Sequence, residues 1–328
     1  MRYIESPSHD AWFNMALEEY VFESLDKNED WFMLWQNNNT IVVGKYQNTI
    51  EEINAEYVKD NNISIVRRLS GGGAMYQDMG NLNFTFVVDQ DTSKTLDFGI
   101  FIQPVIKALA AIGVTAERNS RNDITIEDQK FSGNSQYNKR GRTMHHGTLL
   151  FNADLNVVGK ALQVKADKIE SKGVKSVRSR VTNILPHMKE PITLEQFKKE
   201  LLAQMFEANS LEEYKLTDAD IANIQKLRDE KYITWDWNYG KSPAYNMRKE
   251  RRYPFGGITV TMDVEKGVIR TIRFNGDFFG NGDILELCAA LEGQPLTKEA
   301  VLAALKDVDV NAYIMGMDAD TMVDLLLY

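Results

Sequence analysis

The chain of 328 residues contains one cysteine, Cys288, and four histidines. A single thiol excludes an intrachain disulfide and a metal centre built from several cysteines, and it fits a reducing compartment. No apolar run approaches the roughly 20 residues that a membrane helix requires. The N-terminal segment MRYIESPSHD also lacks the apolar core of a signal peptide. These absences predict a cytoplasmic protein without a membrane segment.

Positive charge is also scarce. The formal net charge is −9 and the sequence pI is about 5.2, which opposes a nucleic-acid binder because such proteins need a basic surface. One basic island, residues 165–180, interrupts this pattern. It suits phosphates or an acidic partner, although a solvated charged face explains it equally well. The hydrophobic content of 43% is enough for a proper core, and the length predicts one large domain plus a smaller one.

The densest local feature is the stretch VRRLSGGGAMYQDMGNLNFTF, from Val66 to Phe86, with three consecutive glycines at 71–73. Residues 63–66 and 82–88 have strand patterns, and the alternation in the second predicts that one face is buried. Without a Cβ, the glycines permit positive φ or close approach of a ligand, and exposed backbone N–H groups suit an anion. The alternative is an ordinary hairpin loop with solvated Arg67 and Arg68. Neither a Walker A loop nor a dinucleotide-binding fingerprint is present.

A second polar region predicts a hairpin that carries chemistry. Residues 121–126 and 129–134 flank a Glu127-Asp128 turn, which places Lys130 on a strand. A further turn at Arg140-Gly141 leads into a strand over 144–151, on which His145 and His146 point to opposite faces. They therefore cannot readily share one metal, and we set zinc aside. Asp123 is the better metal candidate, as a hard oxygen ligand for Mg²⁺ on a nucleotide.

The remaining patterns predict the framework. We expect an amphipathic helix over 10–25, with Glu18, Glu19 and Glu23 mostly off its apolar face. Trp35, at the end of a predicted strand over 31–35, is either a core residue or the wall of an apolar pocket. The charged run 248–252 predicts a linker, and alternating strands over 258–264 and 268–274 follow it. We therefore expect a catalytic domain at 1–247 and a small α+β domain at 248–328.

Five motifs, in order, resemble the bacterial lipoate-protein ligase A family. They are RRLSGGGAMYQDMGNLNFTF at 67–86, RNDI at 121–124, KFSGN at 130–134, HHGTLL at 145–150 and SVRSRVTNI at 176–184. The resemblance extends almost end to end, with less specific motifs after about residue 250. It implies an α+β fold, in which a mixed β-sheet of the biotin/lipoate-protein ligase type is flanked by helices, plus the family's small C-terminal accessory domain.

The resemblance implies a reaction in two steps. Lipoate and ATP, with Mg²⁺, give lipoyl-AMP and pyrophosphate. A lysine of an acceptor then attacks the mixed anhydride to leave a lipoyl-lysine amide and AMP. The acceptors are lipoyl domains of 2-oxo acid dehydrogenase E2 subunits and the glycine-cleavage H protein. Joining a carboxylate to a phosphate concentrates negative charge, which fixed cations and N–H donors stabilise.

The resemblance also assigns residues. Lys130 matches the catalytic lysine, and Asp123 would face Mg²⁺. The lipoate-binding positions are Trp35, Arg68, Ser70, Gly71, Gly72, Gly73 and His146. The positions for ATP or the adenylate are Arg68, Gly73, Ala74, Tyr76, Asn81, Asn122, Asp123, Lys130, Thr148, Ser176, Val177, Arg178 and Ser179. The loop over 176–183 would close over the adenylate and exclude water.

Three related functions compete with this interpretation. Biotin-protein ligases carry a GRGR-type loop that this sequence lacks. Octanoyl or lipoyl transferases that pass through an acyl-cysteine need a thiol in the catalytic domain, whereas Cys288 lies in a helical pattern over 282–291 and is expected to face a core. A non-catalytic subunit of a lipoylation complex is the third alternative, and retention of Lys130 and Arg68 argues against it.

Overall fold

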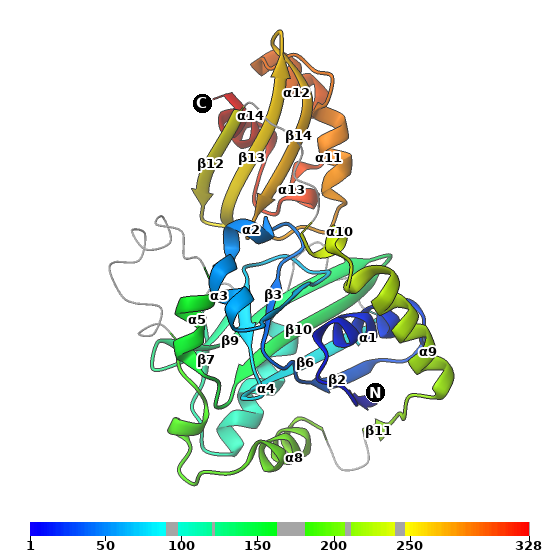
Figure 1. Cartoon of the computed structure of the whole chain (residues 1–328), viewed down its shortest axis with the longest axis vertical. Coiled ribbons are helices and arrows are strands. Elements are labelled where there is room, and N and C mark those ends of the chain that lie inside the picture. Colours follow the sequence, from blue (N-terminus) through cyan, green and yellow to red (C-terminus); the bar gives the residue numbers. More distant parts are fainter. Residues whose placement is uncertain (90–97, 120–121, 163–180, 207–210, 240–246, 328) are drawn as a thin grey trace. The chain divides into compact units, whose positions relative to one another are not determined.

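The structure is a computed structural model that describes residues 1–89, 98–119, 122–162, 181–206, 211–239 and 247–327 (Figure 1). The chain forms two compact units. The first contains Met1–Val43, Ile50–Arg68 and Met75–Asn238, and the second contains Gly44–Thr49, Leu69–Ala74 and Tyr239–Tyr328. Among the described residues, no helix is both long and apolar enough to cross a membrane.

The first unit is built on a mixed sheet of eight strands. β1 runs parallel to β2 and β11, and the other neighbours are antiparallel. The mixed sheet and flanking helices confirm the predicted fold class. In spatial order the strands are β11 (Glu212–Glu213), β1 (Arg2–Glu5), β2 (Trp31–Trp35), β6 (Asn81–Val88), β10 (Arg142–Leu150), β9 (Gln129–Lys139), β8 (Asp123–Ile126) and β7 (Glu117–Arg118).

Strand β6 is buried along its whole length, so the prediction that only one of its faces is buried is wrong. Helices contact both faces of the strand. On one, Thr85 donates a hydrogen bond to Glu18 of α1 (Ala11–Glu23). On the other, the ring of Phe86 packs 5.6 Å from that of Phe101 in α4 (Gly99–Ala111). Alternation along a strand reports burial only when one face remains in water.

The glycine-rich stretch follows a strand of a second, smaller sheet. In it β3 (Thr40–Val43) pairs in parallel with β4 (Ser64–Arg67) and antiparallel with β5 (Met75–Gln77). The glycines therefore lie between β4 and β5 rather than directly before β6. The other helices of this part of the chain are α2 (Thr49–Glu52), α3 (Ala55–Asp60), α5 (Leu155–Ala161), η1 (Leu185–His187), α8 (Leu194–Met205), α9 (Asp218–Leu227), η2 (Arg228–Tyr232) and α10 (Trp235–Asn238).

Local sequence signals define several of these ends. Asp10 caps α1 by accepting hydrogen bonds from the backbone N–H groups of Trp12 and Phe13. A capping box of Thr193 and Gln196 begins α8. Positive φ angles at Glu127 and Asp128 form the tight turn before β9. The predicted helix over 10–25 and the hairpin around 127–128 are therefore confirmed.

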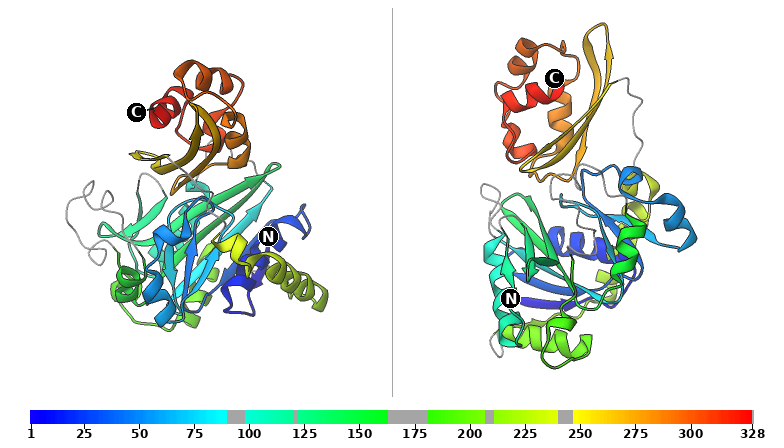
Figure 2. Two further views of the ribbon diagram at one scale, coloured as in Figure 1. Left: turned by 45° about the horizontal axis from the view of Figure 1, so that its top comes forward. Right: turned by 90° about the vertical axis from the view of Figure 1, so that its left-hand side faces the viewer.

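The C-terminal part of the second unit is a three-stranded antiparallel sheet with helices on one face (Figure 2). Its strands are β12 (Met247–Tyr253), β13 (Gly256–Glu265) and β14 (Val268–Gly276), and its helices are α11 (Ile284–Leu291), α12 (Lys298–Ala304), α13 (Val310–Tyr313) and α14 (Ala319–Leu327). The prediction that 248–252 is a linker is wrong, because this run belongs to edge strand β12. Charged side chains are common on edge strands, where they oppose further pairing.

Candidate active site

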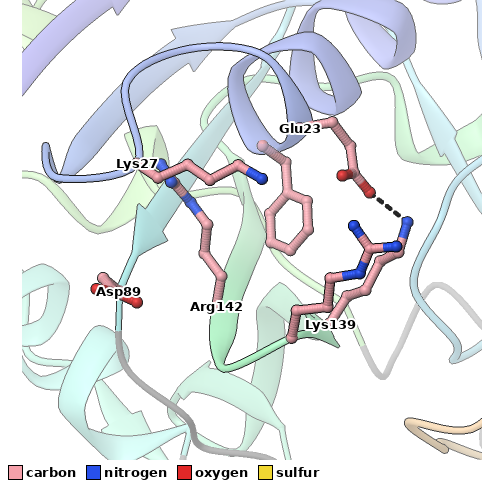
Figure 3. A pocket seen from close by; sticks show the side chains of 7 residues that line it. Glu23, Lys27, Asp89, Lys139 and Arg142 are labelled. Carbon is pink, nitrogen blue, oxygen red and sulfur yellow. Dashed lines mark hydrogen bonds and ion pairs between the residues drawn. The ribbon is translucent and has the colours of Figure 1, made fainter.

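A small cavity of about 60 Å³ lies at the turn end of the β9–β10 hairpin (Figure 3). Glu23 and Lys139 form an ion pair of 2.6 Å at its rim. Burial lowers the pKa of Arg142, which lines the cavity, and the nearby carboxylates of Asp89 and Asp30 oppose that shift. None of the candidate site residues lines this cavity. The candidate residues of the motifs gather instead at the other end of β9 and β10.

At that end, Lys130 and Asp123 form an ion pair with 2.6 Å between Nζ and Oδ1. Asp123 begins β8 and pairs in register with Gly133 of β9. A Cβ on Gly133 would lie 3.0 Å from the Lys130 ammonium. The missing side chain at position 133 therefore leaves room for the lysine to lie across the strands with its charge beside the carboxylate.

Amide and hydroxyl groups join the three strands beneath this pair. Asn122 donates its side-chain N–H to the Asn134 carbonyl at 2.7 Å, and Asn134 returns a hydrogen bond to the Asn122 carbonyl at 3.0 Å. The Thr148 hydroxyl on β10 accepts the backbone N–H of Gly133 at 3.2 Å. The RNDI, KFSGN and HHGTLL motifs, separate in sequence, therefore meet around Lys130.

The two arginines before the glycines have different surroundings. Arg67 donates to the carbonyls of Trp237 and Asn238, each at 3.0 Å, so it ties β4 to the end of α10. Burial lowers the pKa of Arg68 to about 10, which still leaves the guanidinium charged at neutral pH, and the carboxylate of Glu18 opposes the shift. Both side chains are buried. The alternative of solvated arginines is therefore wrong.

Sequence reasoning missed Glu18. Its side chain is only 2% exposed, although the helical pattern placed it off the apolar face of α1. Glu18 Oε1 accepts the Thr85 hydroxyl at 2.6 Å and lies 2.9 Å from His146 Nδ1. Thr85 in turn accepts the indole N–H of Trp35 at 2.9 Å. One buried carboxylate thus links two of the candidate lipoate residues, Trp35 and His146.

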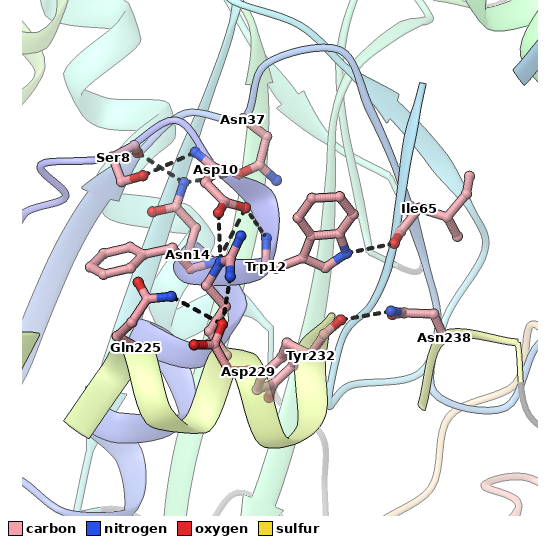
Figure 4. Close-up of polar contacts among 12 residues, drawn as sticks. Ser8, Asp10, Trp12, Asn14, Asn37, Ile65, Gln225, Asp229, Tyr232 and Asn238 are labelled. Carbon is pink, nitrogen blue, oxygen red and sulfur yellow. Dashed lines mark hydrogen bonds and ion pairs between the residues drawn. The ribbon is translucent and has the colours of Figure 1, made fainter. Parts of the chain in front are cut away.

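Polar contacts at the start of α1 hold this helix against its neighbours (Figure 4). Arg228 donates to the capping carboxylate of Asp10 at 2.7 Å, and the indole N–H of Trp12 donates to the Ile65 carbonyl at 3.0 Å. Asn14 donates to the Gln36 carbonyl at 2.8 Å. The burial of a glutamate on this helix follows from what packs around it, and the sequence carries no local signal for it.

The two adjacent histidines face different surroundings, as predicted. His145 is fully buried and stacks on Phe101, with ring centroids 4.6 Å apart. Burial holds the pKa of His145 well below its ordinary value, so the ring is neutral and bonds to Gln136 and Asn134. Within the described ranges, no three His, Cys, Asp or Glu side chains are grouped to hold a metal ion.

The remaining candidate positions are distributed over both units. Ser70 to Ala74 belong to the second unit, and the Ser70 carbonyl there accepts the Lys45 N–H at 2.8 Å. Tyr76 lies on β5 of the small sheet, where its hydroxyl donates to Asn39 at 3.0 Å. Asn81 begins β6 and donates to Asn83, the strand partner of Thr148, at 2.9 Å. The candidates Ser176, Val177, Arg178 and Ser179 lie outside the described residues.

The segment that follows those positions is described, and it pairs with Lys130. Val181 forms a parallel bridge to Lys130, and the Thr182 N–H donates to the Lys130 carbonyl at 2.9 Å. Cys288, by contrast, is 2% exposed on α11 in the core of the second unit, and burial raises its pKa to about 11. It therefore remains a protonated thiol at neutral pH, and its predicted place in a core is confirmed.

Family models match most of the chain. Residues 10–206 match the lipoyl protein ligase A/B catalytic domain, and residues 242–326 match the bacterial lipoate protein ligase C-terminus. The fold and these matches define the class of protein, an enzyme that acts as a ligase.

The relatives specify the class further. The chain is 43% identical over 321 residues to lipoate-protein ligase LplJ of Bacillus subtilis and 44% identical over 317 residues to lipoate--protein ligase 1 of Staphylococcus aureus, with 97% of each chain covered. This chain belongs to the lipoate-protein ligase family.

Solved structures have the same fold. P. falciparum LipL1, crystallised with lipoate, matches with a TM-score of 0.79 at 23% identity, over 99% of this chain and 98% of that one. A bipartite lipoate protein ligase from Thermoplasma acidophilum, studied with its E2 lipoyl domain, matches with a TM-score of 0.64 at 26% identity, over 75% of this chain and 98% of that one.

Proposed function

We propose that this protein activates lipoate with ATP to lipoyl-AMP and then transfers the lipoyl group to a lysine of a lipoyl domain. The acceptors are the E2 subunits of 2-oxo acid dehydrogenases and the glycine-cleavage H protein. The observation that carries the proposal is the meeting of three motifs around Lys130, whose ammonium lies 2.6 Å from Asp123 at the corner of β8, β9 and β10. A need for ATP and the single buried thiol support a cytoplasmic location.

Lys130 acts in this proposal as a fixed cation near the bond that forms. Attack of the lipoate carboxylate on the α-phosphate brings two anions together, and a positioned ammonium lowers the energy of that encounter. Its side chain is 37% exposed, so it is accessible to a substrate. Pairing with Asp123 orients the ammonium before substrate arrives. A substrate phosphate can then replace the carboxylate as its partner.

Asp123 fits a magnesium ion held mainly by nucleotide phosphates. Mg²⁺ is usually bound through one or two protein carboxylates, with phosphates and water completing the shell. Asp123 supplies one partly exposed carboxylate, and no group of three or more His, Cys, Asp or Glu side chains is placed to hold a metal among the described residues. The ion would neutralise phosphate charge when bound. Asn122, Thr148, Tyr76 and Asn81 complete the proposed nucleotide-binding set. Asn122 and Thr148 also join the strands around Lys130.

Lipoate is assigned to Trp35, Arg68, His146 and the loop from Ser70 to Gly73. Arg68 supplies the buried positive charge that a carboxylate needs, and Trp35 supplies an apolar ring. Glu18 joins this set as a positioning residue, because it bonds Thr85 and His146 and lies close enough to Arg68 to support its charge. The loop over 176–183 would cover the adenylate, and the hydrogen bond from the Thr182 N–H to the Lys130 carbonyl supports this proposal.

We further propose that residues 1–247 form the catalytic domain and 248–328 the accessory domain.

The experiment for the whole proposal is incubation of the protein with ATP, lipoate and a purified lipoyl domain, followed by intact mass analysis of the acceptor and measurement of AMP. Lipoylated acceptor that forms only with ATP supports the proposal. Modification that proceeds from a pre-acylated donor without ATP would identify a transferase instead. A protein that binds lipoate and acceptor but forms neither product would be a non-catalytic subunit.

A further inference from the structure

The glycine loop is structurally part of the second unit. Leu69–Ala74 clusters with Gly44–Thr49 and with the chain after residue 239. Tyr46, in the segment Gly44–Thr49, is 4% exposed in the hydrophobic core formed by the C-terminal sheet and helices. Its ring stacks on Phe278, with centroids 4.8 Å apart and 11° between the planes. The backbone N–H of Gly276 also donates to the Tyr46 carbonyl at 2.8 Å.

Two of the three glycines are required by the backbone at Phe278. A Cβ on Gly71 would lie 2.5 Å from the Phe278 carbonyl oxygen and 3.3 Å from Phe279 Cα. Gly72 has φ of +89°, a conformation that residues with a Cβ rarely adopt, and its N–H donates to the same carbonyl at 3.3 Å. The expectation that these N–H groups face an anion therefore fails for Gly72. Gly73 is different, because a Cβ there would meet nothing within 4 Å.

The segment that carries Phe278 is itself held by close backbone contacts. A Cβ on Gly280 would lie 1.9 Å from the Tyr313 carbonyl oxygen, and one on Gly282 would lie 2.4 Å from the Tyr313 ring. The Tyr46 hydroxyl donates to the carbonyl of Gly280 at 3.3 Å. The close contacts with Tyr313 and Tyr46 therefore restrict the movement of the segment over 276–282. Phe278 itself is fully buried.

We infer that Phe278 and Tyr46 are positioning residues, which hold the glycine loop in the conformation that binds lipoate. The inference rests on the proposed function, since it assumes that the loop from Ser70 to Gly73 contacts lipoate. The stacked rings fix the Phe278 carbonyl, and that carbonyl sets the path of Gly71 and Gly72. The conformation of the lipoate loop then depends on Phe278, which lies about 200 residues away in sequence. The positions of Lys130 and Asp123 do not depend on Phe278.

The test compares Phe278→Leu and Tyr46→Leu with a matched core variant, Phe274→Leu. Phe274 is 4% exposed in the same core, on β14. We expect Phe278→Leu and Tyr46→Leu to raise the Kd for lipoate, measured by calorimetry, about tenfold, with ATP affinity changed less than about twofold. Phe274→Leu should lower thermal stability and leave the lipoate Kd within about twofold of the parent value. Tyr46→Phe, which keeps the ring, should restore most of the affinity.

Equal loss of lipoate affinity in Phe274→Leu would overturn the inference, because instability alone would then explain the effect. Unchanged affinity in both Phe278→Leu and Tyr46→Leu would overturn it as well. Hydrogen exchange of the peptide over 69–74 gives an independent readout if a variant is too unstable for calorimetry. The inference requires faster exchange in Phe278→Leu than in Phe274→Leu. Failure of the proposed function would look different, because the parent protein itself would not bind lipoate.

Discussion

Replacing Lys130 with methionine separates catalysis from stability. Methionine keeps an unbranched stem of similar length and removes the charge. The Lys130–Asp123 pair has side chains 37% and 22% exposed, and ion pairs this close to water contribute about 1 kcal/mol or less to folding. The proposed contact with the reacting groups contributes much more. Loss of one such electrostatic contact costs about 3 kcal/mol, or about 150-fold in rate.

The chain offers a matched control on the same strand. Lys139, at the other end of β9, pairs with Glu23 at 2.6 Å, with side chains 40% and 28% exposed. Lys139→Met removes the same charge from an equivalent ion pair, far from the motif residues. The two variants should therefore unfold within about 1 kcal/mol of the parent protein in denaturant titrations. Only Lys130→Met should lose activity.

The assay measures the rate of lipoyl-AMP formation in a single turnover, with the enzyme in excess over lipoate. The reaction is monitored through the release of pyrophosphate. This measures the adenylation step without acceptor binding or product release. A folded Lys130→Met protein with a rate within about fivefold of the parent would refute the assignment of Lys130 to adenylation. Equal losses of rate in Lys130→Met and Lys139→Met would instead assign the effect to general changes in surface charge.

Three further predictions concern buried groups. Burial holds the pKa of His145 well below its ordinary value of 6.5, so between pH 7.5 and 5.5 mainly the unfolded state takes up this proton. The free energy of unfolding should therefore fall by about 1 kcal/mol more over this range in the parent protein than in His145→Gln, as denaturant titrations would measure. Gly147→Ala should lose about 1–3 kcal/mol of stability, because its Cβ would meet Asn134 and Phe84, whereas Gly159→Ala, where the space is open, should not. Cys288→Ser should lose about 1–3 kcal/mol but retain ATP-dependent lipoyl transfer. An acyl group found on Cys288 without ATP would contradict that expectation.

The sequence by itself determined the local elements of this protein. The helix over 10–25 and the turn at Glu127-Asp128 use hydrogen bonds and φ angles set within a few residues, so their patterns predicted them correctly. The motif order around Lys130 also identified the family. Strand alternation predicted β13 and β14, which have one covered and one open face.

Only the tertiary structure decided the features that depend on distant neighbours. Glu18 is buried because α1 packs on β6, where Thr85 and His146 provide its hydrogen bonds. Burial of β6 on both faces requires helices that the strand's own pattern cannot report. The glycines at 71 and 72 are explained by the carbonyl of Phe278, a contact that no spacing within the loop encodes. Burial and backbone contact depend on which surfaces meet in three dimensions, and short sequence patterns do not contain that information.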